Sequence, residues 1–193
     1  PPRVTIPHIN LVMDGSVAEV LVAEMNVAMS KEGESVYLKP ETTEAEKRIL
    51  EAADLAKMRA LRYFIEFCRE RELRVIIFCE SISLLRWISS NMDVPLLEGV
   101  CGQAEREFVV DQFNRGNQHV IIVSNVGDAA MNIPTANIGI NLFTTKSVQV
   151  EVQRRGRISR IKAERLWPDG PHALYVQLLS VLHGSNKPTT VAK

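Results

Sequence analysis

The sequence predicts an α/β protein with a mainly parallel sheet and helices on both faces of that sheet. Three continuous apolar runs, at 74–79, 119–123 and 137–142, are typical of parallel strands buried on both sides. Helical apolar spacing alternates with these runs along the chain, as in three-layer α/β folds. A chain of 193 residues is also long enough for one well-buried core and short for two.

The elements follow from local pattern. Three prolines and the turn signal Asp14-Gly15-Ser16 predict an incoming linker over residues 1–16. One domain is expected over 17–183, opening with a strand at 17–25, and a flexible tail over 184–193. The apolar stripe from Glu44 to Arg71 predicts a long helix. The remaining predictions are a helix at 83–91, a brief strand at 95–97, a helix at 103–114 with Phe108, Val109 and Phe113 inward, a helix carrying the arginines near 154–160, and a last strand at 172–179.

Composition excludes several classes of protein. Apolar residues make up 46% and charged residues 24%, an ordinary globular balance, and no apolar run approaches the roughly 20 residues of a membrane helix. No membrane partner is therefore expected. Cys68, Cys79 and Cys101 have no metal-type spacing, so we expect reduced, mostly buried thiols and no metal site.

Charge is unevenly distributed along the chain. The net charge of zero argues against a generic nucleic-acid binder, yet residues 151–165 hold six basic and two acidic side chains. Concentrated positive charge of this kind can make an anion site on a neutral protein.

The most informative stretch is residues 153–160. On a helix, positions i, i+3, i+4 and i+7 share one face, and here they are Gln153, Gly156, Arg157 and Arg160. Guanidinium groups bond phosphate oxygens bidentately, so this face suits a phosphate-bearing partner. Val148 and Val152 lie on another side, where we expect them to pack inward. The alternative is a solvated basic helix.

A second constellation follows the strand that ends at Val123. Ser124, Gly127, Asp128 and Asn132, with the small residues between them, predict a tight loop with exposed backbone amides. Amides and hydroxyls of this kind often contact nucleic-acid phosphates. The alternative is a plain strand-to-helix loop.

The two constellations together resemble a known family. Ser-x-x-Gly-Asp-x-x-x-Asn-x-Pro (124–134) and Gln-x-x-Gly-Arg-x-x-Arg (153–160) are similar to motifs V and VI of superfamily 2 helicases. Within that superfamily the chain most resembles the XPB family, through the segments 57–60 and 75–78 and through Gly99 with Gln103. The resemblance covers roughly residues 17–180. It implies a three-layer RecA-like domain, the second motor lobe.

The sequence has no Gly-x-x-x-x-Gly-Lys-[Ser/Thr] phosphate loop and no Asp-Glu-x-[Asp/His] box. In such motors both belong to the first lobe. The resemblance therefore implies that ATP and Mg²⁺ are held mainly by a first lobe outside this sequence, and that this chain alone is inactive.

The resemblance also implies roles for single residues. Arg157 and Arg160 would reach the γ-phosphate of ATP as arginine fingers, and Gln153 would sense the nucleotide. The cofactor-binding residues would be Gly127, Asp128, Asn132 and Gly156, and the nucleic-acid-binding residues would be Ser124, Gly99 and Gln103. XPB-type sequences usually have Asp at the position of Asn132.

The resemblance implies that the complete protein is a nuclear, ATP-dependent DNA helicase or translocase that acts in transcription initiation and nucleotide excision repair. Its implied partners are its own first lobe, DNA, and other TFIIH subunits or repair factors. One alternative is a diverged, non-catalytic lobe that serves as a protein-interaction module in a TFIIH-type complex. Another is the lobe of a chromatin remodeller or restriction-type translocase, because Gly139-Ile-Asn-Leu is similar to those enzymes.

Overall fold

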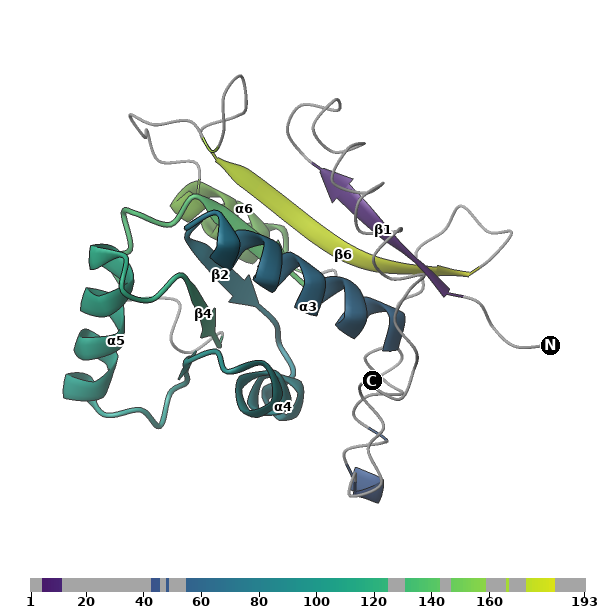
Figure 1. The fold of residues 1–193 in the computed structure, drawn as a ribbon, viewed down its shortest axis with the longest axis horizontal. Coiled ribbons are helices and arrows are strands. Elements are labelled where there is room, and N and C mark those ends of the chain that lie inside the picture. Colours follow the sequence, from purple (N-terminus) through teal and green to yellow (C-terminus); the bar gives the residue numbers. More distant parts are fainter. Residues whose placement is uncertain are drawn as a thin grey trace.

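The computed structural model describes residues 5–11, 43–45, 48, 55–124, 131–142, 147–158, 166 and 173–182. The strands are β1 (Thr5–Leu11), β2 (Val75–Phe78), β3 (Leu96–Leu97), β4 (Val120–Val123), β5 (Ile138–Asn141) and β6 (Leu174–Leu182). The helices are α3 (Leu55–Glu70), α4 (Ile82–Met92), α5 (Gln103–Arg115) and α6 (Val148–Ile158), as Figure 1 shows.

The strands form one sheet in the order β1-β6-β5-β2-β4-β3. The pairs β6–β5, β5–β2, β2–β4 and β4–β3 are all parallel, and β1 alone pairs antiparallel, with β6. The predicted mainly parallel sheet is therefore confirmed. Each of the three apolar runs became a central strand, fully buried along its length.

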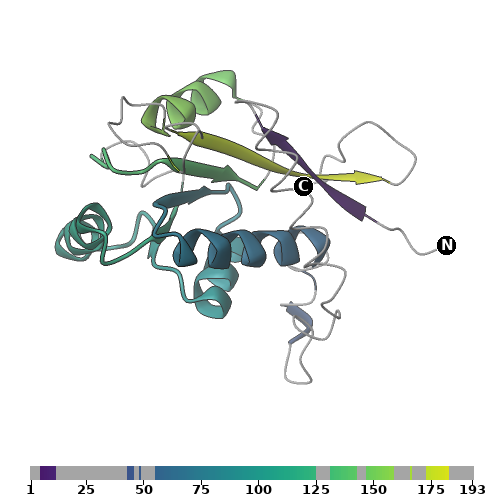
Figure 2. The same ribbon diagram turned by 45° about the horizontal axis from the view of Figure 1, so that its top comes forward.

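The three layers follow from the two-residue period of the strands. Val75 and Ile77 pack in one core with α3 and α4, whereas Ile76 and Phe78 pack in a second core with α5 and α6. Figure 2 shows α6 on one side of the sheet and α3 and α4 on the other. Helices thus cover both faces, as predicted.

The sheet extends into the segment that was expected to be a linker. Residues 5–11 form β1, which pairs with β6 from Thr5↔Leu182 to Leu11↔Val176. The prolines did not prevent this, because an edge strand tolerates residues without an N–H donor. The predicted strand at 17–25 and the tail at 184–193 lie outside the described residues, and the division at residues 17 and 183 stays a prediction.

The helix predicted from Glu44 to Arg71 is confirmed over α3, and residues 44, 45 and 48 are helical as well; the other residues before Leu55 lie outside the described part of the chain. One prediction about a helix face needs correction. Phe108 was expected to face inward, yet it is 64% exposed, whereas Phe113 is fully buried. Two side chains five residues apart on a helix point in directions that differ by about 140°, so only one of these two rings can face the sheet.

The carboxyl ends of the central strands lie side by side at one edge of the sheet. The amide of Leu142, just after β5, donates to the carbonyl of Phe78 at the end of β2 (3.1 Å). The amide of Ser124, just after β4, donates to the carbonyl of Leu97 in β3 (3.0 Å). Ligands of α/β folds bind beyond such an edge, and α6 follows β5 there.

Candidate functional site

Helix α6 is fixed at its start by a capping serine. The Oγ of Ser147 accepts a hydrogen bond from the amide of Val150 (3.3 Å), which satisfies one of the amides left open by the first turn. Its sheet-facing residues follow the helical period i, i+3, i+4, i+7 and are Glu151, Arg154, Arg155 and Ile158. Three of these four are charged, which is unusual for the buried side of a helix.

Glu151 forms the centre of a polar network under α6. Its Oε2 accepts from Asn141 Nδ2 on β5 (3.2 Å) and from the Tyr175 hydroxyl on β6 (3.2 Å). Its Oε1 accepts from Gln177 Nε2 on β6 (3.0 Å) and from Arg155 Nη2 (3.1 Å). Burial, together with the neighbouring Glu151 carboxylate, raises the pKa of Tyr175, so its hydroxyl stays a donor.

Arg154 is the most deeply buried charge of the helix. It is 1% exposed, and its guanidinium lies over the ring of Phe78 with the carbon 5.2 Å from the ring centroid. Its Nη1 also donates to Asn141 Oδ1 (3.4 Å). These contacts make Arg154 a packing residue of the α6–sheet interface. Arg154 is not singled out by the sequence, because the sequence alone does not show which of the four arginines between 154 and 160 is buried.

Arg157 points along the flank of the helix rather than into the sheet. It is partly buried, and its Nη1 donates to the backbone carbonyl of Met131 (2.9 Å). Met131 lies seven residues after Ser124, in the segment that the sequence predicted as the second constellation. The structure therefore joins the two predicted motifs at this bond, and Asn132 follows directly.

The outward side of α6 carries Gln153 and Gly156, and both are exposed. A Cβ placed on Gly156 would meet none of the described residues within 4 Å. Val148 and Val152 also lie here, 78% and 61% exposed, so the expectation that they pack inward was wrong. The physical reason is that the polar network occupies the inward side, leaving the valines the opposite one.

Ser124 lies at the end of β4 and is 1% exposed. Its Oγ has no hydrogen-bond partner among the described residues, although its backbone is tied to β3. A buried hydroxyl without a partner carries a desolvation cost of about 1–3 kcal/mol. Ser124 is thus less accessible than the sequence suggested.

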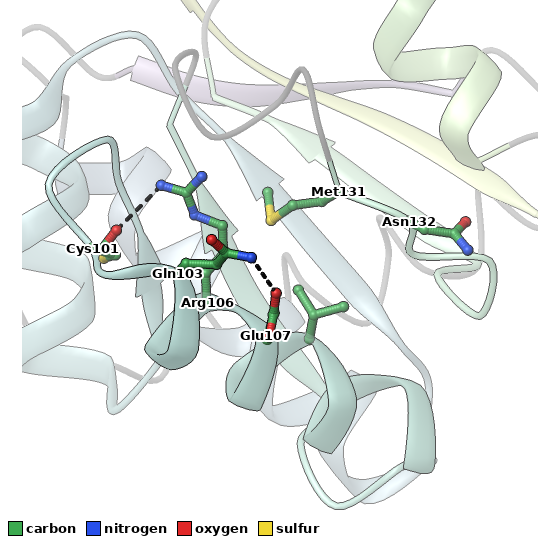
Figure 3. Close-up of a pocket in the computed structure, with 7 residues that line it drawn as sticks. Cys101, Gln103, Arg106, Glu107, Met131 and Asn132 are labelled. Carbon is green, nitrogen blue, oxygen red and sulfur yellow. Dashed lines mark hydrogen bonds between the residues drawn. The ribbon is translucent and has the colours of Figure 1, made fainter.

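A cavity of about 520 Å³ lies at the start of α5 (Figure 3). It brings together Gln103 and Asn132, two predicted site residues from different motifs. In Figure 3 Gln103 and Arg106 lie beside one another and Met131 faces the same space. The full lining is Cys101, Gln103, Arg106, Glu107, Val110, Met131 and Asn132.

Arg106 holds the turn that precedes α5. Its Nη2 donates to the carbonyls of Glu98 (3.3 Å) and Cys101 (3.4 Å), which fixes the exposed Gly99 between them. Gln103 is exposed, and its Nε2 donates to Glu107 Oε1 (2.8 Å). Gly99 and Gln103 therefore lie at the same end of α5, on the surface.

Two of the three thiols, Cys68 and Cys79, are buried. All three cysteines are free, as predicted, and burial raises the pKa of Cys79 to about 11 and that of Cys68 further. Such thiols stay protonated at neutral pH.

Within the described ranges, no three His, Cys, Asp or Glu side chains gather as metal ligands would. No helix in those ranges has the length and apolar character to cross a bilayer. Arg160, Gly127 and Asp128 lie outside the described residues.

The fold resembles that of helicase C-terminal lobes. The solved C-terminal domain of the DEAD-box protein Dbp5 superposes with a TM-score of 0.50 at 19% sequence identity, covering 64% of this chain and 69% of that one. At this identity the likeness concerns the fold alone. It bears out the RecA-like, three-layer prediction.

Sequence comparison narrows the class to one family. Residues 11–182 match the family described as ERCC3/RAD25/XPB C-terminal helicase, and the chain belongs to that family. It is similar to the general transcription and DNA repair factor IIH helicase/translocase subunit XPB1 of Arabidopsis thaliana (30% identity, 81% of this chain, 21% of the relative). It is also similar to subunit XPB/SSL2 of Saccharomyces cerevisiae (28% identity, 86% of this chain, 20% of the relative). The chain thus spans about a fifth of the length of these relatives.

Proposed function

We propose that this chain is the second motor lobe of an ATP-dependent DNA helicase or translocase that acts in transcription initiation and nucleotide excision repair. Arg157 and Arg160 act as arginine fingers toward the γ-phosphate of ATP, which a first lobe holds with Mg²⁺. Hydrolysis of that nucleotide supplies the energy for movement along DNA. The proposal includes a nuclear location and assembly with TFIIH-type subunits, as the relatives' names suggest.

The observation that carries the proposal is the bond between Arg157 and the Met131 carbonyl. It links the arginine helix to the segment after β4, at the sheet edge where ligands of α/β folds bind. A guanidinium has five N–H donors in a planar fork, so a bond to one carbonyl is compatible with a further bond to phosphate. The residues present therefore suit a phosphoryl group delivered from outside the lobe.

Other residues take roles around this arginine. Gln153 and Gly156, exposed on the same helix, lie where the nucleotide and the first lobe would approach, and Gln153 couples the nucleotide to lobe closure. We assign Gly127, Asp128 and Asn132 to the nucleotide edge. The exposed apolar stripe of Val148 and Val152 is consistent with a surface that another lobe covers.

The DNA contacts are assigned to the start of α5 and the end of β4. Gly99 and Gln103 lie together at the surface by the cavity, and a helix N-terminus favours phosphate groups. Ser124 lies at the neighbouring strand end, buried, with its hydroxyl unpartnered among the described residues. Contacts to the phosphate backbone would make binding largely independent of base sequence and strongly dependent on salt.

The test is DNA-stimulated ATP hydrolysis by the complete two-lobed protein. We expect Arg157→Ala and Arg160→Ala each to lower kcat by about 10³-fold or more, because an arginine finger stabilises the charge of the transition state. Arg62→Ala is the matched control: this arginine lies on α3, on the opposite face of the sheet, and pairs with Glu66 at the surface.

The chain alone, mixed with ATP and DNA, serves as the negative control and should show no turnover. Wild-type turnover by both finger variants would contradict the motor proposal. It would favour the interaction-module alternative, in which the lobe keeps the fold and recruits partner proteins.

A further inference from the structure

We propose that Glu151 is a positioning residue for Arg157. It holds α6 at the rotation from which the Arg157 guanidinium reaches the phosphoryl group. This inference rests on the proposed function, because it assigns a further residue to the same site. Glu151 itself faces the sheet and acts only through the helix that carries both residues.

The first argument is the number of elements that Glu151 joins. Its carboxylate accepts from Asn141 on β5, from Tyr175 and Gln177 on β6, and from Arg155 one turn along α6. The side chain is only 13% exposed, so these bonds are screened little by solvent. One carboxylate therefore ties the first turn of α6 to the carboxyl end of β5 and to the first half of the neighbouring strand β6.

The second argument is what else holds α6. Of its described apolar residues, Ile158 in the last turn is the buried one, and it sits against Gly139 of β5. Val148 and Val152, in the first two turns, are exposed, and Val150 between them is only half-buried. The start of the helix thus depends on polar contacts, above all those of Glu151.

The third argument is geometric. Side-chain atoms of a helix lie about 6 Å from its axis, so a rotation of roughly 10° moves them by about 1 Å. A shift of that size at a catalytic group can lower the rate by about 10²-fold. Loss of the Glu151 bonds would permit such a rotation about the contacts that remain further along α6, those of Arg154 and Ile158.

The experiment compares Glu151→Ala, Glu151→Gln and Arg157→Ala in the complete two-lobed protein. We expect Glu151→Ala to lower the kcat of DNA-stimulated ATP hydrolysis by about 10- to 100-fold with little change in KM for ATP, since the finger acts in the transition state. Glu151→Gln should recover part of the rate, because its amide oxygen still accepts from Asn141 or Tyr175. Gln149→Ala, exposed on the same helix, is the control.

A double variant separates positioning from general damage. If Glu151 acts through Arg157, Glu151→Ala should lower kcat by less than about twofold in the Arg157→Ala background, whereas independent effects would multiply. Tyr175→Phe removes a single donor from the network and should lower kcat in the same direction by about two- to fivefold. It keeps the test available if Glu151→Ala does not fold.

The outcomes distinguish the two proposals. Multiplying losses, or normal turnover in Glu151→Ala and Tyr175→Phe while Arg157→Ala is inactive, would overturn the positioning role and leave the motor proposal standing. Normal turnover in Arg157→Ala would overturn the positioning role, and normal turnover in Arg160→Ala as well would overturn the motor proposal.

Discussion

Adjacent arginines on α6 have different physical roles. Arg154 is buried, stacks on Phe78 and donates to Asn141, so its charge is part of the interface between helix and sheet. Arg155 lies half-buried with its carbon 5.5 Å from the Tyr175 ring centroid and pairs with Glu151. Arg157 lies on the flank and bonds a backbone carbonyl. Of these three, Arg157 is the one that we propose acts on the companion lobe.

This difference predicts opposite effects on stability and activity. Arg154→Ala should lower the free energy of unfolding by about 2–3 kcal/mol, because it empties a packed site and leaves Asn141 Oδ1 without that donor. Arg157→Ala should lower it by less than about 1 kcal/mol, since Arg157 is only partly buried and its bond to the Met131 carbonyl is an ordinary hydrogen bond. Urea unfolding of the 193-residue chain measures both. Equal losses would contradict the assignment of distinct roles.

At the scale of elements, two glycines determine how α6 meets its surroundings. A Cβ on Gly139 would lie 2.8 Å from Ile158 Cγ1 and 2.9 Å from Tyr175 Cδ2, so this glycine permits the close approach of α6 to β5. Gly156 on the outward side has no such contact within the described residues. A glycine inside a helix lowers stability by about 0.5–1 kcal/mol relative to alanine. Packing against the described residues of this lobe therefore does not explain why a glycine stands at this position.

Gly156→Ala should separate stability from activity. We expect it to raise the free energy of unfolding by up to about 1 kcal/mol, because alanine is the better helix former and has room. In the complete protein it should lower kcat, because the added methyl group lies on the side that we propose faces the nucleotide and first lobe. Thermal unfolding and ATP hydrolysis measure the two effects. Unchanged kcat would show that this side of α6 needs no close approach.

At the scale of the whole molecule, the sequence predicted the sheet better than the helix surfaces. Continuous apolar runs such as 75–78 are typical of buried strands, and the structure has strands at those positions. Val148 and Val152 were misjudged because hydrophobic character alone does not say which side of a helix faces the sheet. The β1–β6 pairing joins residues about 170 positions apart, a contact that no local pattern encodes.

The candidate site was predicted in part for a similar reason. Motif spacing indicated Arg157 and Asn132, and the structure brings their segments together through Met131. Glu151 and Arg154 were missed because their importance comes from Asn141, Phe78 and Tyr175, which lie on separate strands. A signal was present in the polar Asn141 at the end of an apolar run, since such a residue needs a buried partner.

The central claim is that α6 completes an active site whose nucleotide pocket lies on a companion lobe. The most direct measurement is a structure of the complete two-lobed protein with DNA, ADP, Mg²⁺ and a planar analogue of the transferred phosphoryl group. The account predicts Arg157 guanidinium nitrogens within about 2.7–3.1 Å of the analogue's oxygen or fluorine atoms. A closed complex in which Arg157 bonds only the Met131 carbonyl, with another cation contacting the analogue, would contradict it.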